Sequence, residues 1–98
     1  MNEKQLQDFT IKKANERGIL AYKTVSVGRR GFPDLTLIGD GGVVWFVELK
    51  HPNGKGQLSN HQIKTIADLR ANGANVAVVS STEEVIELLN SFQRFLLH

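Results

Sequence analysis

The sequence contains no cysteine, which excludes a disulfide scaffold, a zinc finger and a thiol nucleophile. It also lacks a long hydrophobic run: the longest covers residues 43–47, far short of the roughly 18 apolar residues that a membrane-spanning helix needs. The polar first residues continue directly into a helical pattern, so we expect no signal peptide. Repeats, low-complexity tracts and linkers are absent as well. We therefore expect a cytoplasmic protein with one domain over residues 1–98.

What is present is an ordinary globular composition with an uneven charge. The 98 residues are 41% hydrophobic and 22% charged, which excludes wholesale disorder. Residues 1–64 carry ten Lys or Arg against six Asp or Glu, whereas residues 65–98 carry two against four. The basic part is suited to a polyanion such as nucleic acid, but a bias this small favours a solvated surface without a partner.

Hydrophobic periodicity and turn residues predict an α/β fold of order αβββαβα, a mixed four-stranded sheet flanked by helices. The expected helices cover residues 3–17, 59–72 and those from 81 or 82 onwards, and the expected strands cover residues 19–25, 34–38, 43–50 and 75–80. Two helices begin with a pair of residues typical of a capping box, Asn2 with Gln5 and Ser59 with Gln62.

The tight turn after the second strand predicts how the two central strands align. If residues 40–42 form a three-residue loop, Gly39 pairs with Val43, and Asp34 then lies opposite Glu48 with Cβ atoms about 5 Å apart. Because side chains alternate along a strand, Lys50 points to the same side as Glu48.

Two facing carboxylates repel each other unless a positive charge lies between them. A divalent cation is the natural solution, because Mg²⁺ is held by one or two carboxylates and keeps positions for phosphate oxygens. Lys50 is placed to orient an attacking water or to neutralise charge in the transition state. The alternative is that Asp34 merely starts a strand while Glu48 and Lys50 form a solvent-exposed pair. The spacing and the opposed Asp34 favour the metal site.

These residues resemble the motif of a known nuclease superfamily. Pro33-Asp34, followed after thirteen residues by Glu48-Leu49-Lys50, is similar to the PD-(D/E)xK pattern, and the predicted αβββαβ order matches the core of that superfamily. The closer resemblance is to the VRR-NUC family, whose stand-alone bacterial and phage members are about this size. It covers nearly the whole chain, including the segments of residues 28–34 and 58–62.

The resemblance implies a role for each matching residue. Asp34 and Glu48 would bind Mg²⁺ or Mn²⁺, helped by the carbonyl oxygen of Leu49, and Lys50 would position or activate the water. Members of the family are metal-dependent nucleases that act on branched or otherwise structured DNA. Small members resemble Holliday-junction resolvases, which are homodimers because a four-way junction has two-fold symmetry. This chain has no appended recognition domain, so 5′-flap activity is not expected.

Two further residues have both a functional and a structural interpretation. By resemblance, Glu3 would reach the metal directly or through water, but a carboxylate in a first helical turn is also favourable through the helix dipole alone. Gln62 would line the site from the second helix, but it also completes the capping box.

The loop before Asp34 contains candidate DNA contacts. Arg29 and Arg30 lie between glycines, and an arginine can clamp a phosphate in bidentate fashion. Lys55, also between glycines, is a weaker candidate. The alternative is a solvated basic loop. His51 and His61 are expected at the surface.

The last helix has apolar residues on more than one side. Such a helix buries more than one face, which favours a two-fold dimer through this helix over a frayed apolar end. The sequence and the resemblance thus predict a homodimeric, Mg²⁺- or Mn²⁺-dependent DNA endonuclease that is similar to Holliday-junction resolvases and acts in a bacterial or phage-infected cell. The alternatives are a non-catalytic nucleic-acid-binding subunit, a restriction-type endonuclease and a small interaction domain.

Overall fold

The computed structural model of the chain describes residues 1–25, 28, 30–52 and 57–96, the last four by their backbone alone. Its elements, in chain order, are α1 (Glu3–Glu16), β1 (Leu20–Lys23), β2 (Leu35–Ile38), a 3₁₀ helix η1 (Asp40–Gly42), β3 (Val44–Leu49), α2 (Asn60–Ala71), β4 (Asn75–Val79) and α3 (Thr82–Leu96). The predicted order of helices and strands is confirmed, and several elements end one or two residues earlier than expected.

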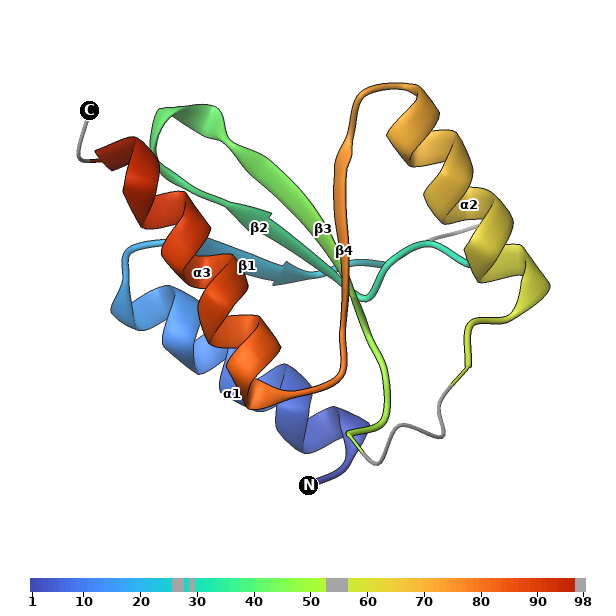
Figure 1. Cartoon of the computed structure of the whole chain (residues 1–98), viewed down its shortest axis with the longest axis horizontal. Coiled ribbons are helices and arrows are strands. Elements are labelled where there is room, and N and C mark those ends of the chain that lie inside the picture. Colours follow the sequence, from blue (N-terminus) through green and yellow to red (C-terminus); the bar gives the residue numbers. More distant parts are fainter. Residues whose placement is uncertain (26–27, 29, 53–56, 97–98) are drawn as a thin grey trace.

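The four strands form one mixed sheet between two layers of helices. Its order is β1-β2-β3-β4; β2 is antiparallel to both β1 and β3, and β4 is parallel to β3. Helices α1 and α3 pack together on one side of the sheet, and α2 lies on the other (Figure 1). The sheet therefore separates the helix pair from the single helix that follows β3.

The predicted register of the central hairpin is confirmed. Leu35 pairs with Val47, and the amide of Gly39 donates to the carbonyl of Val43 at 2.7 Å, which closes the loop of residues 40–42. One detail of the prediction is wrong: the paired part of β2 starts at Leu35, so Asp34 is not a ladder partner of Glu48. Instead, the carboxylate of Asp34 accepts a hydrogen bond from the backbone amide of Leu49 in β3.

The main core lies between the sheet and the helix pair. Alternating residues of the central strands, such as Leu35, Leu37 and Val47, are fully buried on this side. They pack with buried apolar side chains of the two helices: Leu6, Ala14, Val85, Leu88, Leu89 and Phe92.

This core accounts for much of the apolar character of α3. Its four buried apolar side chains contact the chain's own core, and Ile86 is half-buried. The structure says nothing about the side chains of residues 93–96. The observation that suggested a dimer through this helix therefore has an explanation inside the chain, and the dimer stays a prediction.

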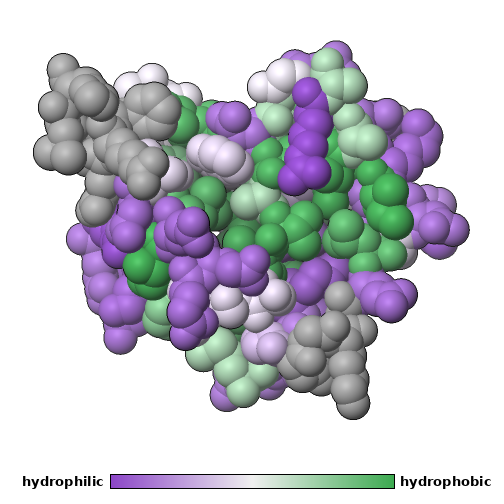
Figure 2. Space-filling view, in the orientation of Figure 1, coloured by the Kyte–Doolittle hydropathy of each residue, from purple (hydrophilic) through white to green (hydrophobic). Residues whose placement is uncertain are grey.

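The other side of the sheet is covered by α2 (Figure 1). Helix α2 contacts β4, and each contributes a buried side chain, Ile66 and Val76. Apolar side chains gather at the centre of the molecule, over β4 and towards α2, between hydrophilic flanks (Figure 2). None of the helices in the described part of the chain has the length and apolar character that crossing a membrane requires.

Candidate functional site

The centre of the site is a buried glutamate near the end of β3. The side chain of Glu48 is only 2% exposed. Its Oε2 accepts a hydrogen bond from Nε2 of Gln62 at 2.5 Å, whereas Oε1, equally buried, has no hydrogen-bond partner within the described residues. Buried polar atoms are almost always paired, so this carboxylate oxygen is suited to a further partner such as a cation.

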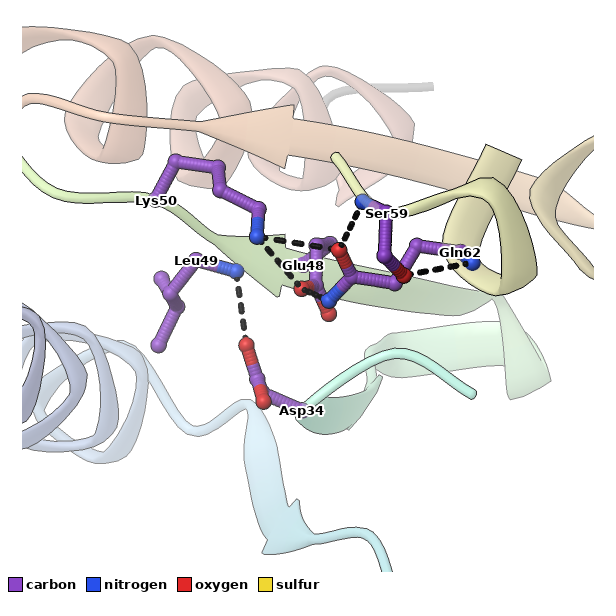
Figure 3. A network of polar contacts seen from close by, with 6 residues as sticks. All are labelled: Asp34, Glu48, Leu49, Lys50, Ser59 and Gln62. Carbon is purple, nitrogen blue, oxygen red and sulfur yellow. Dashed lines mark hydrogen bonds and ion pairs between the residues drawn. The ribbon is translucent and has the colours of Figure 1, made fainter. Parts of the chain in front are cut away.

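Asp34 is held beside this glutamate by two backbone contacts. Its Oδ2 accepts from the amide of Leu49 at 2.9 Å, and its carbonyl accepts from the amide of Thr24, also at 2.9 Å. Since β2 and β3 are neighbours, the two carboxyl groups meet at the same end of the sheet (Figure 3). The predicted approach of Asp34 to Glu48 thus occurs through a side-chain contact with β3 rather than through strand pairing.

The proximity of the two acids changes the chemistry of one of them. Burial and, to a smaller extent, the negative charge of Asp34 together raise the pKa of Glu48 from 4.5 to about 7, although the ammonium of Lys50 opposes the shift. Near neutral pH, this carboxyl therefore favours either a proton or a cation. A divalent cation would remove the repulsion that the proton otherwise relieves.

Lys50 lies over the same group, as predicted. Its Nζ is 3.7 Å from Oε2 of Glu48 and donates to Oε1 of Gln62 at 3.0 Å. The side chain is only 14% exposed. The ammonium is therefore held near the carboxylates by a neutral amide rather than by a tight ion pair.

Gln62 joins the site to the start of α2. Its side-chain Oε1 accepts from Lys50 and, at 2.8 Å, from the backbone N–H of Ser59. The backbone N–H of Gln62 donates to Oγ of Ser59 at 3.2 Å. Two donors fix the carbonyl end of the side-chain amide, so its NH₂ end must face Glu48. The predicted capping box is confirmed, and the same glutamine reaches the acid and the lysine. The sequence analysis treated capping and site lining as alternatives, but the geometry allows both.

The segment that leads to Asp34 is packed against the same helix. Gly31 has φ +86°, and a Cβ atom at this position would collide with the carbonyl of His61. The hydroxyl of Thr65 donates to the carbonyl of Arg30 at 3.1 Å. This contact was not predicted, because it joins residues 35 positions apart in the sequence. The only signal in the sequence is the glycine itself, which permits close backbone approach.

The remaining predicted residues lie around this centre or outside the description. Glu3 is exposed in the first turn of α1, and no group of three or more His, Cys, Asp or Glu suited to a metal occurs among the residues that the structure describes. Arg30, in the loop before Asp34, and His61, in the first turn of α2, are exposed. Arg29 and Lys55 lie outside the described residues. The metal role of Glu3 and of the Leu49 carbonyl remains a prediction.

The donor set suits a hard divalent cation. Mg²⁺ and similar ions prefer oxygen ligands and need only one or two carboxylates when water and substrate phosphate supply the rest. Asp34 and Glu48 meet that requirement, and the unpaired Oε1 of Glu48 is the observation that fits it best.

A mixed sheet of this order, with an aspartate, a glutamate and a lysine gathered where its central strands end, defines a nuclease domain of the PD-(D/E)xK kind. Comparisons with known proteins specify it further. The model of the VRR-NUC domain family matches residues 2–83, and the chain belongs to this family. A solved structure described as a VRR_NUC domain shares 35% sequence identity, covers 90% of this chain and 94% of its own, and superposes with a TM-score of 0.81.

A curated relative comes from a phage. "Putative nuclease p44" of Acyrthosiphon pisum secondary endosymbiont phage 1 is 34% identical over 83 residues, which is 85% of this chain and 87% of the relative. The similarity therefore extends over nearly the full length of both proteins.

Proposed function

We propose that the chain is a divalent-metal-dependent endonuclease that hydrolyses phosphodiester bonds of DNA, with residues 1–98 acting as one nuclease domain. The observation that carries the proposal is the buried, unpaired oxygen of Glu48 beside the carboxylate of Asp34 and the ammonium of Lys50. Membership of a nuclease family supports the same class of reaction.

Asp34 and Glu48 would hold Mg²⁺ or Mn²⁺, together with the carbonyl oxygen of Leu49 and with Glu3 directly or through water. When bound, the metal supplies a Lewis acid for the phosphate and lowers the pKa of an attacking water. The chain's own contribution is to fix the acids. The amide of Leu49 orients Asp34, and the amide group of Gln62 orients Glu48.

Lys50 provides a positive charge that needs no rearrangement during the reaction. Its Nζ is already held by Gln62, at 3.0 Å, next to the carboxylate pair. From this position it would orient the water or stabilise negative charge that develops on the phosphate oxygens. Arg29, Arg30 and Lys55 would contact the DNA backbone nearby.

For the substrate, we propose branched DNA, with a four-way junction as the first candidate and a homodimer as the active form. A dimer matches the two-fold symmetry of the junction. Similarity to a phage protein supports a setting in the cytoplasm of a phage-infected bacterial cell. The alternative is a non-catalytic nucleic-acid-binding subunit, but it predicts a broken site, and Asp34, Glu48 and Lys50 are all present.

The test is cleavage of labelled four-way junction, flap, single-stranded and linear duplex DNA, each with Mg²⁺, Mn²⁺ or EDTA. Lys50→Ala is compared with Lys12→Ala, which removes an exposed lysine on α1. Light scattering on the same samples measures whether the protein is a dimer.

Symmetric junction cutting that needs metal, disappears in Lys50→Ala and survives in Lys12→Ala would establish the proposed function. Cutting of another substrate would keep the chemistry and replace the specificity. A folded wild-type protein that cuts no substrate with either metal would overturn the enzyme and favour the binding subunit.

A further inference from the structure

A pocket lies near the candidate site, between the loop before Asp34 and α2. It has a volume of about 470 Å³ and is formed between the loop before Asp34 and the first turns of the helix. Arg30 lines it from the loop, and Asn60, His61, Lys64 and Asp68 line it from α2. None of these helix residues has a role in the site described above.

The two walls of this pocket are fixed to each other. The Thr65 hydroxyl donates to the carbonyl of Arg30, and Gly31 touches the backbone of α2 where no larger residue fits. Gln62 belongs to the same helical turns, and Asp34 follows Gly31 by three residues. The position of the pocket relative to the candidate metal site is therefore set by the fold.

The polar groups in the pocket suit a phosphate. Arg30 and Lys64 are exposed cations, and His61 adds a third group that can donate a hydrogen bond. Asp68 pairs with Lys64 at 3.1 Å, but both side chains are largely exposed, at 48% and 75%. An exposed pair of this kind is weak, so Lys64 can exchange the carboxylate for a phosphate at little cost.

We propose that this pocket binds a backbone phosphate of the DNA that flanks the phosphate cleaved at Asp34 and Glu48. This inference rests on the proposed function, because it assigns a second contact to the same substrate. The pocket holds the DNA strand through Arg30 and Lys64 and sets its position over the carboxylates. It contributes to affinity and not to the chemical step.

The experiment measures binding of fluorescein-labelled four-way junction and linear duplex DNA by anisotropy, in EDTA so that no cleavage occurs, at several salt concentrations. The double variant Arg30→Ala/Lys64→Ala is compared with Lys4→Ala/Lys12→Ala. The control removes two exposed cations of α1, and Lys4 is paired with Asp8 at 3.2 Å just as Lys64 is paired with Asp68.

We expect the pocket variant to bind about tenfold more weakly and the slope of log affinity against log salt to fall by about 1, as for one lost phosphate contact. The control variant keeps the wild-type affinity. Asp68→Asn removes the competing carboxylate and binds DNA more tightly than Asp8→Asn, its counterpart on α1. Inorganic phosphate competes with DNA for the wild-type protein more strongly than for the pocket variant.

Equal binding by the pocket and control variants, with circular dichroism showing that both are folded, would overturn the proposal, as would a wild-type protein that binds no DNA. Cleavage with Mn²⁺ separates the two inferences. If the wild-type protein cuts DNA but the pocket variant binds normally, the pocket is refuted and the nuclease stands. If DNA binding depends on the pocket but no DNA is cut, the proposed nuclease activity is refuted, and the pocket remains a binding site for a DNA phosphate.

Discussion

Helices α1 and α2 both begin with a capping box, but only in α2 does the capping glutamine also contact residues of the candidate site. In α1, Asn2 and Gln5 exchange two hydrogen bonds, both at 2.8 Å, and Gln5 is exposed. In α2, Ser59 and Gln62 exchange the same two bonds, at 2.8 and 3.2 Å. Gln62 is half-buried, however, and its amide continues to a glutamate and a lysine.

The difference lies in the surroundings and not in the local sequence. The start of α2 lies against the end of β3, where a buried carboxyl with a raised pKa needs a donor. The start of α1 offers its glutamine no such contact among those described. A capping box therefore predicts where a helix begins, and tertiary placement decides whether its glutamine also acts in a functional site.

Replacing the capping glutamine of each helix should give the largest difference in cleavage rate between the two helices. Gln62→Met removes the acceptor of Lys50 and the donor of Glu48, so we expect kcat to fall about 10²-fold. The pH of half-maximal activity should also rise, because the lost bond favoured the charged form of Glu48. Gln5→Met should keep the wild-type rate and pH profile. Single-turnover cleavage from pH 6 to 9 measures both, and matching profiles for the two variants would refute the role of Gln62.

The next largest effect concerns the stability of the metal-free protein against pH. Because the folded-state pKa of Glu48 is raised from 4.5 to about 7, the folded state binds a proton that the unfolded state releases. This stabilisation is complete below pH 4.5 and is lost as the pH rises through about 7. It amounts to at most about 3 kcal/mol.

Glu48→Gln should remove this pH dependence and make the metal-free protein more stable than wild type at pH 8, while abolishing cleavage. Glu83→Gln, which changes an exposed glutamate of α3, is the control. Urea unfolding in EDTA at pH 5 and pH 8 gives the two free energies for each protein. An identical decrease for wild type and Glu48→Gln would show that Glu48 is not the group responsible.

A smaller effect tests the packing of the loop against α2. Gly31 and Gly28 both have φ +86°, but only Gly31 contacts the backbone of the helix. Gly31→Ala should therefore destabilise the protein by about 1–3 kcal/mol more than Gly28→Ala, since the added methyl group displaces the loop. The midpoints of urea unfolding measure the difference. Equal losses would mean that the loop shifts freely and does not fix Asp34 relative to α2.

The smallest expected effect compares the two capping residues themselves. Asn2→Ala and Ser59→Ala should each lower the free energy of unfolding by about 1 kcal/mol. Only Ser59→Ala should also reduce kcat, by a few-fold, because the first turn of α2 positions Gln62. Ser59→Thr restores a capping hydroxyl and should recover the rate. If Asn2→Ala slows cleavage as much as Ser59→Ala, the loss reflects general stability and the comparison fails.

The parts of the fold that depend on neighbouring residues were predictable. The register of β2 and β3 follows from the three-residue loop after Gly39, and both capping boxes follow from residue types three positions apart. That register brings Asp34 and Glu48 to the same end of the two strands, and the alternation of side chains in a strand puts Lys50 on the same side as Glu48, whereas the side-chain bond from Asp34 to β3 was not predicted.

The parts of the fold and the site that depend on contacts between distant residues could not be predicted. The sequence shows Glu48 at the polar end of a strand, and its burial arises from the rest of the fold. The contact of Gly31 with His61 crosses β2, β3 and the loop after β3, and the bond between Gln62 and Lys50 crosses that loop. The apolar residues of α3 suggested contact with a second chain because the sequence pattern does not show how many of them the chain's own core buries.

The central claim is that Asp34 and Glu48 form a divalent-metal site whose glutamate is oriented by the start of α2. Thermal unfolding with and without Mn²⁺ at pH 8 tests it most directly, for the wild-type protein, Glu48→Gln and Glu83→Gln. We predict that Mn²⁺ raises the Tm of the wild type and of Glu83→Gln, since a ligand that binds only the folded state stabilises it, and leaves Glu48→Gln unchanged. An equal rise in all three proteins, or none in the wild type, would contradict the account.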